Sequence, residues 1–177
     1  MSKGDGVNGP KWSMGTEQPR TIMKKTTLCY IENNGCFLML YRNKKKNDDN
    51  AGKGLGIGGK FEPGESADDC VVREVLEETG IRLTSYHFYG VVEFRSDAYE
   101  YEDMYLYSSD NFELPGEDPN DLPACSEGEL HWIKKEDLMS LPMWEGDTVF
   151  LERVLRGDEA INLRMIYKGD HLESVME

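Results

Sequence analysis

Three glutamates, Glu74, Glu77 and Glu78, are spaced so that a helix would carry their carboxylates on one face. Like charges at this spacing destabilise an isolated helix, and helix formation does not require them. Magnesium takes hard oxygen ligands, commonly a few carboxylates together with waters and substrate phosphates. The spacing therefore indicates a site for Mg²⁺ or Mn²⁺, although for three glutamates alone a solvated acidic helix face is the stronger explanation.

The residues around the glutamates change that balance. Gly59 begins the segment, Glu65 lies just before the expected helix, Arg73 adjoins Glu74, and Gly80 can end the helix. Arg73 can orient one carboxylate with a forked hydrogen bond, and Glu65 can anchor the preceding loop. Together these residues favour a metal site over a solvated face.

The same residues form a motif. The 23-residue segment 59–81 matches G-x5-E-x7-R-E-U-x-E-E-x-G-U, with U apolar, at every specified position. It resembles the Nudix box. The resemblance implies the α/β fold class, as a Nudix-type α/β/α sandwich around a mixed β-sheet, over residues 21–177. It also implies hydrolysis of a nucleoside diphosphate linked to another moiety, with Mg²⁺ as the cofactor and Mn²⁺ as a substitute.

The resemblance also assigns roles within the box. Glu74, Glu77 and Glu78 would bind the metal, with the backbone carbonyl of Gly58 as a further ligand. The catalytic roles fall on the same glutamates and on Arg73. Glu74 is the candidate general base for the attacking water, and Arg73 would orient that carboxylate.

Positions next to and beyond the box complete the expected site. Lys60 could reach a substrate phosphate. Families of this type often use another acid from a loop beyond the box, and Glu127 is our first candidate for this metal ligand. Glu129 is the alternative, and either acid could instead be simply solvated.

The segment Leu141–Asp147 resembles the MutT-like branch of the family, which hydrolyses oxidised purine nucleoside triphosphates such as 8-oxo-dGTP to a nucleoside monophosphate and pyrophosphate. The resemblance implies that Trp144 stacks on a purine and that Asp147 accepts hydrogen bonds from its edge. Gly146 and Leu55 stand where that branch has a base-contacting aspartate and asparagine. The alternative is that Trp144 is a core or hinge aromatic and Asp147 an ordinary helix N-cap.

Other activities stay open. One alternative substrate is another nucleoside diphosphate derivative, a dinucleoside polyphosphate or ADP-ribose. Members directed at ADP-ribose usually carry prolines shortly after the box, and here none lies between Pro63 and Pro115. A non-catalytic nucleotide-binding regulator would be expected to lack a box glutamate, and an acidic cation-binding module is a third hypothesis.

The composition of the chain limits the kinds of partner that we expect it to bind. The chain has 177 residues and a net charge of −14, which argues against binding polymeric nucleic acid. No apolar run approaches the roughly 18 residues of a membrane span. Four cysteines lack Cys-x-x-Cys spacing, so we expect reduced thiols in a cytoplasmic protein. We expect a small nucleotide as ligand, a monomer or homodimer, and a flexible N-terminal tail over residues 1–20.

The elements that must position these residues follow from local signals. Asn34-Gly35 supplies the positive φ angles of a tight hairpin between apolar runs at 26–32 and 36–42. Ser66 can cap a helix that runs to Thr79, and its inward face would comprise Val71, Val72, Val75 and Leu76. The other predicted elements are antiparallel strands at 86–95 and 101–108, strands at 129–134, 161–167 and 171–175, a helical turn at 136–140 and a helix at 147–156.

Gly54, Gly56 and Gly59 match the dinucleotide fingerprint G-x-G-x-x-G, and the same segment nearly matches a P-loop. No helix follows directly, and Phe61 stands where a P-loop requires Ser or Thr. We reject both motifs, and expect these glycines to let the backbone turn tightly and expose its carbonyls.

Overall fold

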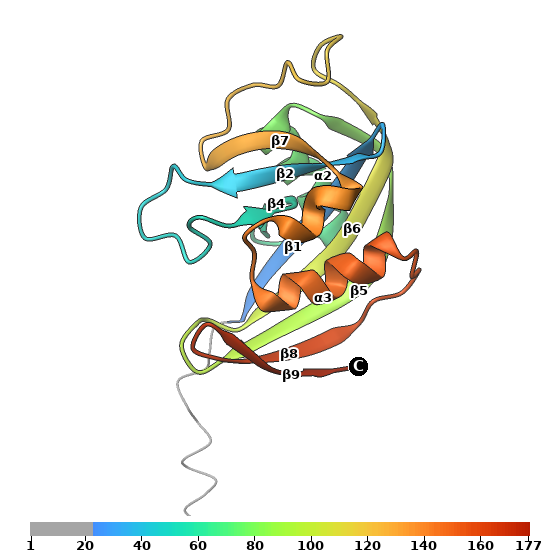
Figure 1. The fold of residues 1–177 in the computed structure, drawn as a ribbon. Coiled ribbons are helices and arrows are strands. Elements are labelled where there is room, and N and C mark those ends of the chain that lie inside the picture. The colour runs from blue at the N-terminus through green and yellow to red at the C-terminus, as the bar shows by residue number, and fades with distance from the viewer. Residues whose placement is uncertain (1–22) are drawn as a thin grey trace, which may run out of the picture.

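The computed structural model describes residues 23–177, so the expected tail over residues 1–20 lies outside the described residues. The elements shown in Figure 1 are β1 (Lys24–Asn33), β2 (Cys36–Arg42), β3 (Gly54–Leu55), β4 (Ile57–Lys60), α2 (Ala67–Thr79), β5 (Arg82–Ser96), β6 (Glu102–Glu113), β7 (Gly128–Lys134), the 3₁₀ helix η1 (Lys135–Ser140), α3 (Glu145–Leu155), β8 (Leu163–Lys168) and β9 (His171–Met176).

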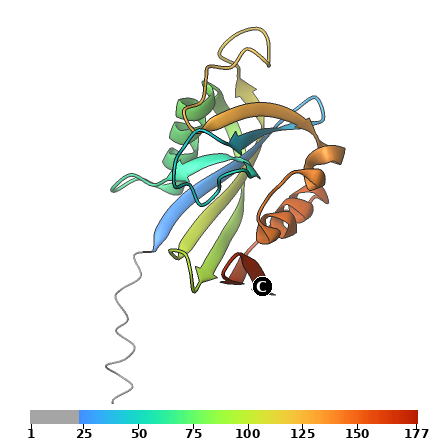
Figure 2. The same cartoon turned by 60° about the vertical axis from the view of Figure 1, so that its left-hand side comes forward.

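A mixed sheet forms the centre of the fold. Strands β4, β1, β6, β5, β8 and β9 lie in this order, with β1–β6 and β5–β8 parallel and the other neighbours antiparallel. Strand β2 turns away from β1 and pairs with β3 and β7. Figure 2 shows α2 and α3 on opposite sides of the strands. The predicted α/β/α arrangement is confirmed.

Strand β1 contributes side chains to the hydrophobic core on each face of the sheet. Successive side chains of a strand point to opposite faces. Leu28 and Tyr30 accordingly join the core that contains Phe150 of α3. Cys29 and Ile31 join the core beneath α2. The candidate residues on α2 and α3 are thus held against one shared strand.

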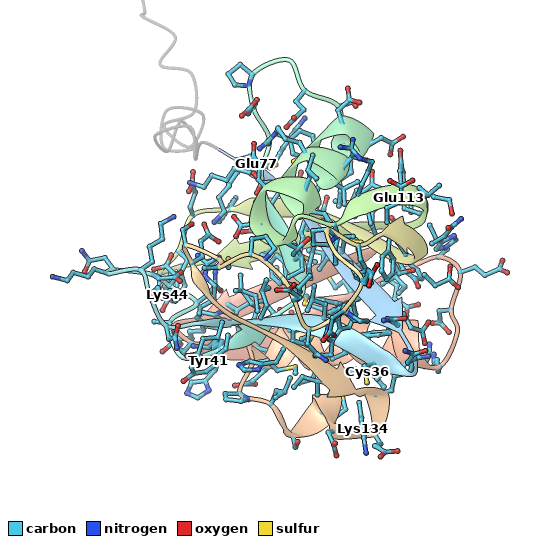
Figure 3. The ribbon with its side chains drawn as sticks, turned by 90° about the horizontal axis from the view of Figure 1, so that it is seen from above. Cys36, Tyr41, Lys44, Glu77, Glu113 and Lys134 are labelled. Carbon is cyan, nitrogen blue, oxygen red and sulfur yellow. The ribbon has the colours of Figure 1, made fainter. Side chains whose placement is uncertain are left out.

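The hairpin turn between β1 and β2 forms as predicted, but the pairing that follows it is short. Asn34 and Gly35 have φ angles of 51° and 73°, as a two-residue turn of this hand requires. The two strands pair only at Glu32–Phe37 and Asn33–Cys36. Beyond Cys36 (labelled in Figure 3), β2 pairs with β7 instead, because β1 is already occupied by β4 and β6.

The caps of α2 also match the prediction. The side chain of Ser66 accepts a hydrogen bond from the amide of Asp69, and Gly80, at φ 75°, donates its amide to the carbonyl of Leu76. The buried face consists of Cys70, Val71, Val75 and Thr79. The expectation that Leu76 points inward is wrong, since its side chain is 37% exposed. It follows Val75 by about 100° around the helix, beyond the edge of the packed face.

The prediction that the glycine-rich segment turns tightly is wrong. Gly54, Gly56, Gly58 and Gly59 belong to or adjoin the short strands β3 and β4, and none has a positive φ angle. Gly56, Gly58 and Gly59 are needed because neighbouring atoms approach their backbone closely, not because the chain turns. A Cβ on Gly58 would lie 1.8 Å from the carbonyl oxygen of Thr27 in β1.

The remaining elements lie where the sequence placed them, with small shifts at their ends. Strands β5 and β6 are antiparallel partners, and β8 and β9 extend the sheet beyond β5. Within residues 23–177, α2 and α3 are too short and too polar to span a bilayer.

Candidate active site

A cleft of about 570 Å³ opens between α2, the sheet and the start of α3. Eight of the nine predicted catalytic, substrate-binding and metal-binding residues line it: Gly58, Lys60, Glu74, Glu77, Glu78, Glu127, Trp144 and Asp147. Arg73 lies behind the lining, in contact with Glu74. The carboxylates of α2 occupy one end, and an aromatic region around Trp144 occupies the other.

The three glutamates of α2 share one face of the helix but differ in exposure. The side chain of Glu74 is 13% exposed, whereas that of Glu77 is 56% exposed on the outer part of the helix (Figure 3). Burial raises the pKa of Glu74, and the charges of Glu77 and Glu78 act in the same direction. Burial also raises the pKa of Glu78, assisted by the charges of Glu127 and Glu77. A cation bound here would relieve this repulsion.

The chemistry of these donors fits a hard divalent cation such as Mg²⁺, because carboxylate and carbonyl oxygens are its usual protein ligands. Glu74 also lies against Gly59, where an added Cβ would be 2.4 Å from the Glu74 carboxyl carbon. Among residues 23–177, no three acidic, histidine or cysteine side chains are already gathered around one point. The donors are therefore suitable in type without being pre-arranged.

Arg73 connects the helix to the loop before it. Its Nε and Nη2 atoms donate to the two carboxylate oxygens of Glu65, at 2.6 and 2.8 Å. Its Nη1 atom donates to Glu74 at 2.9 Å and to Glu77 at 3.1 Å. Glu65 also accepts from the amide of Glu62, and the Arg73 guanidinium lowers the pKa of Glu65 to about 2. The forked bond thus holds Glu65, while single bonds reach the carboxylates of the cleft.

The two acids considered beyond the box lie in different surroundings. Glu127 lines the cleft and accepts hydrogen bonds from Arg42 Nη1 at 2.7 Å and Lys45 Nζ at 3.3 Å. Glu129 lies outside the lining, and its carboxylate contacts the exposed His131 at 3.3 Å. Arg42 also lines the cleft but was missed from the sequence. It is 85 positions away from Glu127, and no short-range pattern connects them.

Trp144 is both a packing residue and part of the cleft. It packs against the core on the α3 side, as the alternative expected, and it also lines the cleft. Its Nε1 donates to Asn50 Oδ1 at 2.8 Å, and the ammonium of Lys53 lies 4.3 Å from the ring centroid. The rings of Tyr99 and Tyr167 meet it edge to face. Asn50, Lys53 and these tyrosines were not identified from the sequence.

Asp147 is a buried acid at the same end of the cleft, 8% exposed. The alternative that it caps α3 is wrong, because the N-cap position is Trp144 and Asp147 lies within the first turn. Burial raises the pKa of Asp147 to about 8, with the charge of Glu102 adding to the effect. Near neutral pH its carboxyl group can therefore both donate and accept hydrogen bonds.

The glycine before Asp147 has a steric explanation. A Cβ on Gly146 would lie 2.5 Å from both Met165 Sδ and the hydroxyl of Tyr167. The amide of Gly146 donates to that hydroxyl at 2.7 Å. A side chain at this position would clash with Met165 and Tyr167, which explains why glycine and not aspartate precedes Asp147.

Comparison with known proteins agrees with the motif and the fold. The NUDIX domain family matches residues 23–154. An uncharacterized Nudix hydrolase of Bacillus subtilis, YvcI, is 27% identical over 151 residues, which cover 83% of this chain and 89% of that protein. An oxidized purine nucleoside triphosphate hydrolase of Danio rerio is 32% identical over 114 residues, covering 63% of this chain and 69% of that protein.

The solved structures lead to the same family. The MutT protein of Bacillus halodurans superposes with a TM-score of 0.73 at 25% identity, covering 86% of this chain and 96% of that one. Together with the box on α2 and the cleft it faces, these matches show that the chain belongs to the Nudix family, as a MutT-like hydrolase of phosphoric anhydride bonds.

Proposed function

We propose that this protein is a Mg²⁺-dependent nucleoside triphosphate pyrophosphohydrolase, which releases a nucleoside monophosphate and pyrophosphate and accepts purine nucleotides, oxidised ones included. The observation that carries the proposal is the division of one cleft into a carboxylate end on α2 and an aromatic end around Trp144 and Asp147. A nucleotide has the matching division into phosphates and base. The Danio rerio relative, named as an oxidized purine nucleoside triphosphate hydrolase, supports the choice of substrate.

Glu74, Glu77, Glu78 and Glu127, with the carbonyl of Gly58, are the residues that would hold the metal. Nudix hydrolases generally use divalent metals. When bound, the metal neutralises phosphate charge and lowers the pKa of bound water. These acids would otherwise repel a nucleotide, so the dependence on a divalent cation follows from the charges of the cleft.

Side chains of the protein would accept the proton, bind a phosphate and bind the base. Glu74, held by Arg73, would accept the proton of the attacking water, since burial already raises the pKa of its carboxyl group. Lys60 would contact a phosphate from the end of β4. At the other end, Trp144 would stack on the base, and the protonated carboxyl of Asp147 would pair a donor and an acceptor with the base edge.

A substrate panel tests the proposal. Hydrolysis of 8-oxo-dGTP, dGTP and pyrimidine triphosphates would be compared with that of ADP-ribose, NADH and diadenosine polyphosphates, with Mg²⁺ and with EDTA. We expect Mg²⁺-dependent pyrophosphate release, fastest from a purine triphosphate. Preference for ADP-ribose or a dinucleoside polyphosphate would overturn the substrate assignment. Tight binding without hydrolysis of any of these would instead indicate a nucleotide-binding regulator.

A further inference from the structure

We propose that Cys125 is a positioning residue for the Glu78 carboxylate, and that its thiol sets the affinity of the site for the divalent cation. This inference rests on the proposed metal-binding role of Glu78. It adds a residue outside the box that acts only through a proposed metal ligand.

The contact itself is the first observation. The Sγ atom of Cys125 donates to Oε2 of Glu78 across a distance of 2.8 Å. Cys125 lies in the segment between β6 and β7, is 5% exposed, and is separated from Glu78 by 47 positions in the chain. Within residues 23–177, Oε1 of Glu78 forms no hydrogen bond, so this oxygen is available to a cation.

The segment that carries the thiol is itself fixed. Lys44 (Figure 3) donates from Nζ to the carbonyl oxygen of Cys125 at 3.0 Å. Two residues later, Glu127 is held by Arg42 and Lys45. The thiol is therefore supported from the loop after β2 and does not depend on the rotamer of Cys125 alone.

The kind of donor matters as much as its position. Glu74 receives its hydrogen bond from the cationic Arg73, whereas Glu78 receives its bond from a neutral thiol. A neutral donor fixes one oxygen of a carboxylate without compensating its charge. Cys125 thus restricts the orientation of Glu78 without placing a positive charge on it, as expected of a group that supports a metal ligand.

The test is the Mg²⁺ affinity of wild type, Cys125→Ala and Cys125→Ser, measured without nucleotide from the rise of Tm with Mg²⁺. It is measured separately as the Mg²⁺ concentration that gives half-maximal hydrolysis of the best panel substrate. Loss of the thiol should raise this concentration by about 10-fold, the lower end of the range for groups that support metal ligands. The kcat at saturating Mg²⁺ should change little. Serine keeps a donor and should restore most of the Mg²⁺ affinity.

Two further variants separate positioning from packing. Cys29→Ala removes another buried thiol, one that makes no side-chain hydrogen bond among the described residues, and should leave the Mg²⁺ dependence at its wild-type value. Cys125→Val keeps the volume without a donor, and should match Cys125→Ala even if the alanine variant has a lower Tm. A wild-type Mg²⁺ dependence in Cys125→Val, or failure of serine to restore it, would overturn the inference.

Glu78→Gln distinguishes this inference from the function on which it rests. If Glu78→Gln has a wild-type Mg²⁺ dependence, the proposed role of Glu78 is wrong. If Glu78→Gln is impaired and Cys125→Val is normal, only the role of Cys125 is wrong.

Discussion

Acids of the same chemical type behave differently in and beside the cleft because their neighbours differ. The pKa of Glu65 is lowered to about 2 by the Arg73 guanidinium, which donates hydrogen bonds to both of its carboxylate oxygens. The pKa values of Glu74 and Glu78 are raised by burial and by neighbouring carboxylates. Glu65 is therefore suited to structural anchoring, whereas Glu74 and Glu78 are suited to binding a cation and moving a proton.

Glu77→Gln and Glu78→Gln test the metal assignment at the level of single side chains. Each should lower kcat/KM by roughly 100-fold or more, because each would remove a proposed charged ligand of the catalytic metal. The Tm should stay the same or rise slightly, since like-charge repulsion is reduced. Glu129→Gln, which lies outside the cleft, is the matched control. Near-wild-type turnover in both variants would contradict the assignment.

Asp147→Asn tests the protonation of the buried acid. With a pKa of about 8 in the folded state and about 4 in the unfolded chain, the folded state retains a proton that the unfolded chain releases. The stability from this group is present at low pH and is lost as pH rises from about 4 to 8. The free energy of unfolding of Asp147→Asn, relative to that of wild type, should be higher at pH 9 than at low pH. The difference should be about 1.4 kcal/mol for each unit by which folding shifts the pKa.

The measurement is the Tm of Asp147→Asn and wild type from pH 5 to pH 9. The difference between them should grow as pH rises. Parallel curves for the two proteins would show that Asp147 is not protonated near neutral pH.

At the scale of elements, two glycines of β4 let this strand lie close to α2 on one side and to β1 on the other. A Cβ on Gly59 would meet the flexible Glu74 carboxylate, whereas one on Gly58 would meet the fixed backbone of Thr27. Gly59→Ala should therefore lower activity by about 10-fold with a small change in Tm, because the carboxylate must move. Gly58→Ala should instead destabilise the fold, by about 3 kcal/mol or more.

Gly116→Ala is the control for these two variants, since its added Cβ would be 3.8 Å from the nearest atom. It should leave both activity and Tm close to wild type. The hydrolysis rates and the Tm values of the three variants test whether Gly59 affects activity and Gly58 affects stability. Equal losses of activity in Gly58→Ala and Gly59→Ala at unchanged Tm would contradict the distinction.

Elements that depend on their own neighbours in the chain could be predicted from the sequence. The caps Ser66 and Gly80 bond to residues within one or two turns of α2, so local signals suffice. Contacts between distant elements could not. Arg42 meets Glu127 only because β2 pairs with β7, and the glycines of β4 are needed only because Thr27 of β1 lies beside them.

At the scale of the whole molecule, the net charge of −14 is divided between a cleft that gathers carboxylates and a solvated surface. Cation binding should therefore stabilise the folded protein. Mg²⁺ at about 100 times its Kd would add about 2.7 kcal/mol and raise the Tm. Glu78→Gln should reduce this rise. An NaCl series of equal ionic strength controls for screening, and an equal rise with NaCl would contradict specific binding.

The central claim is that the carboxylates of α2 hold the divalent cation used to break a phosphoric anhydride bond of a nucleoside triphosphate. Its most direct test is product analysis of purine triphosphate hydrolysis by wild type and Glu78→Gln as Mg²⁺ is varied. We predict equal amounts of nucleoside monophosphate and pyrophosphate from wild type, none with EDTA, and a large rightward shift of the Mg²⁺ curve in the variant. Orthophosphate as the product, or a Mg²⁺ curve that is the same in both proteins, would contradict the claim.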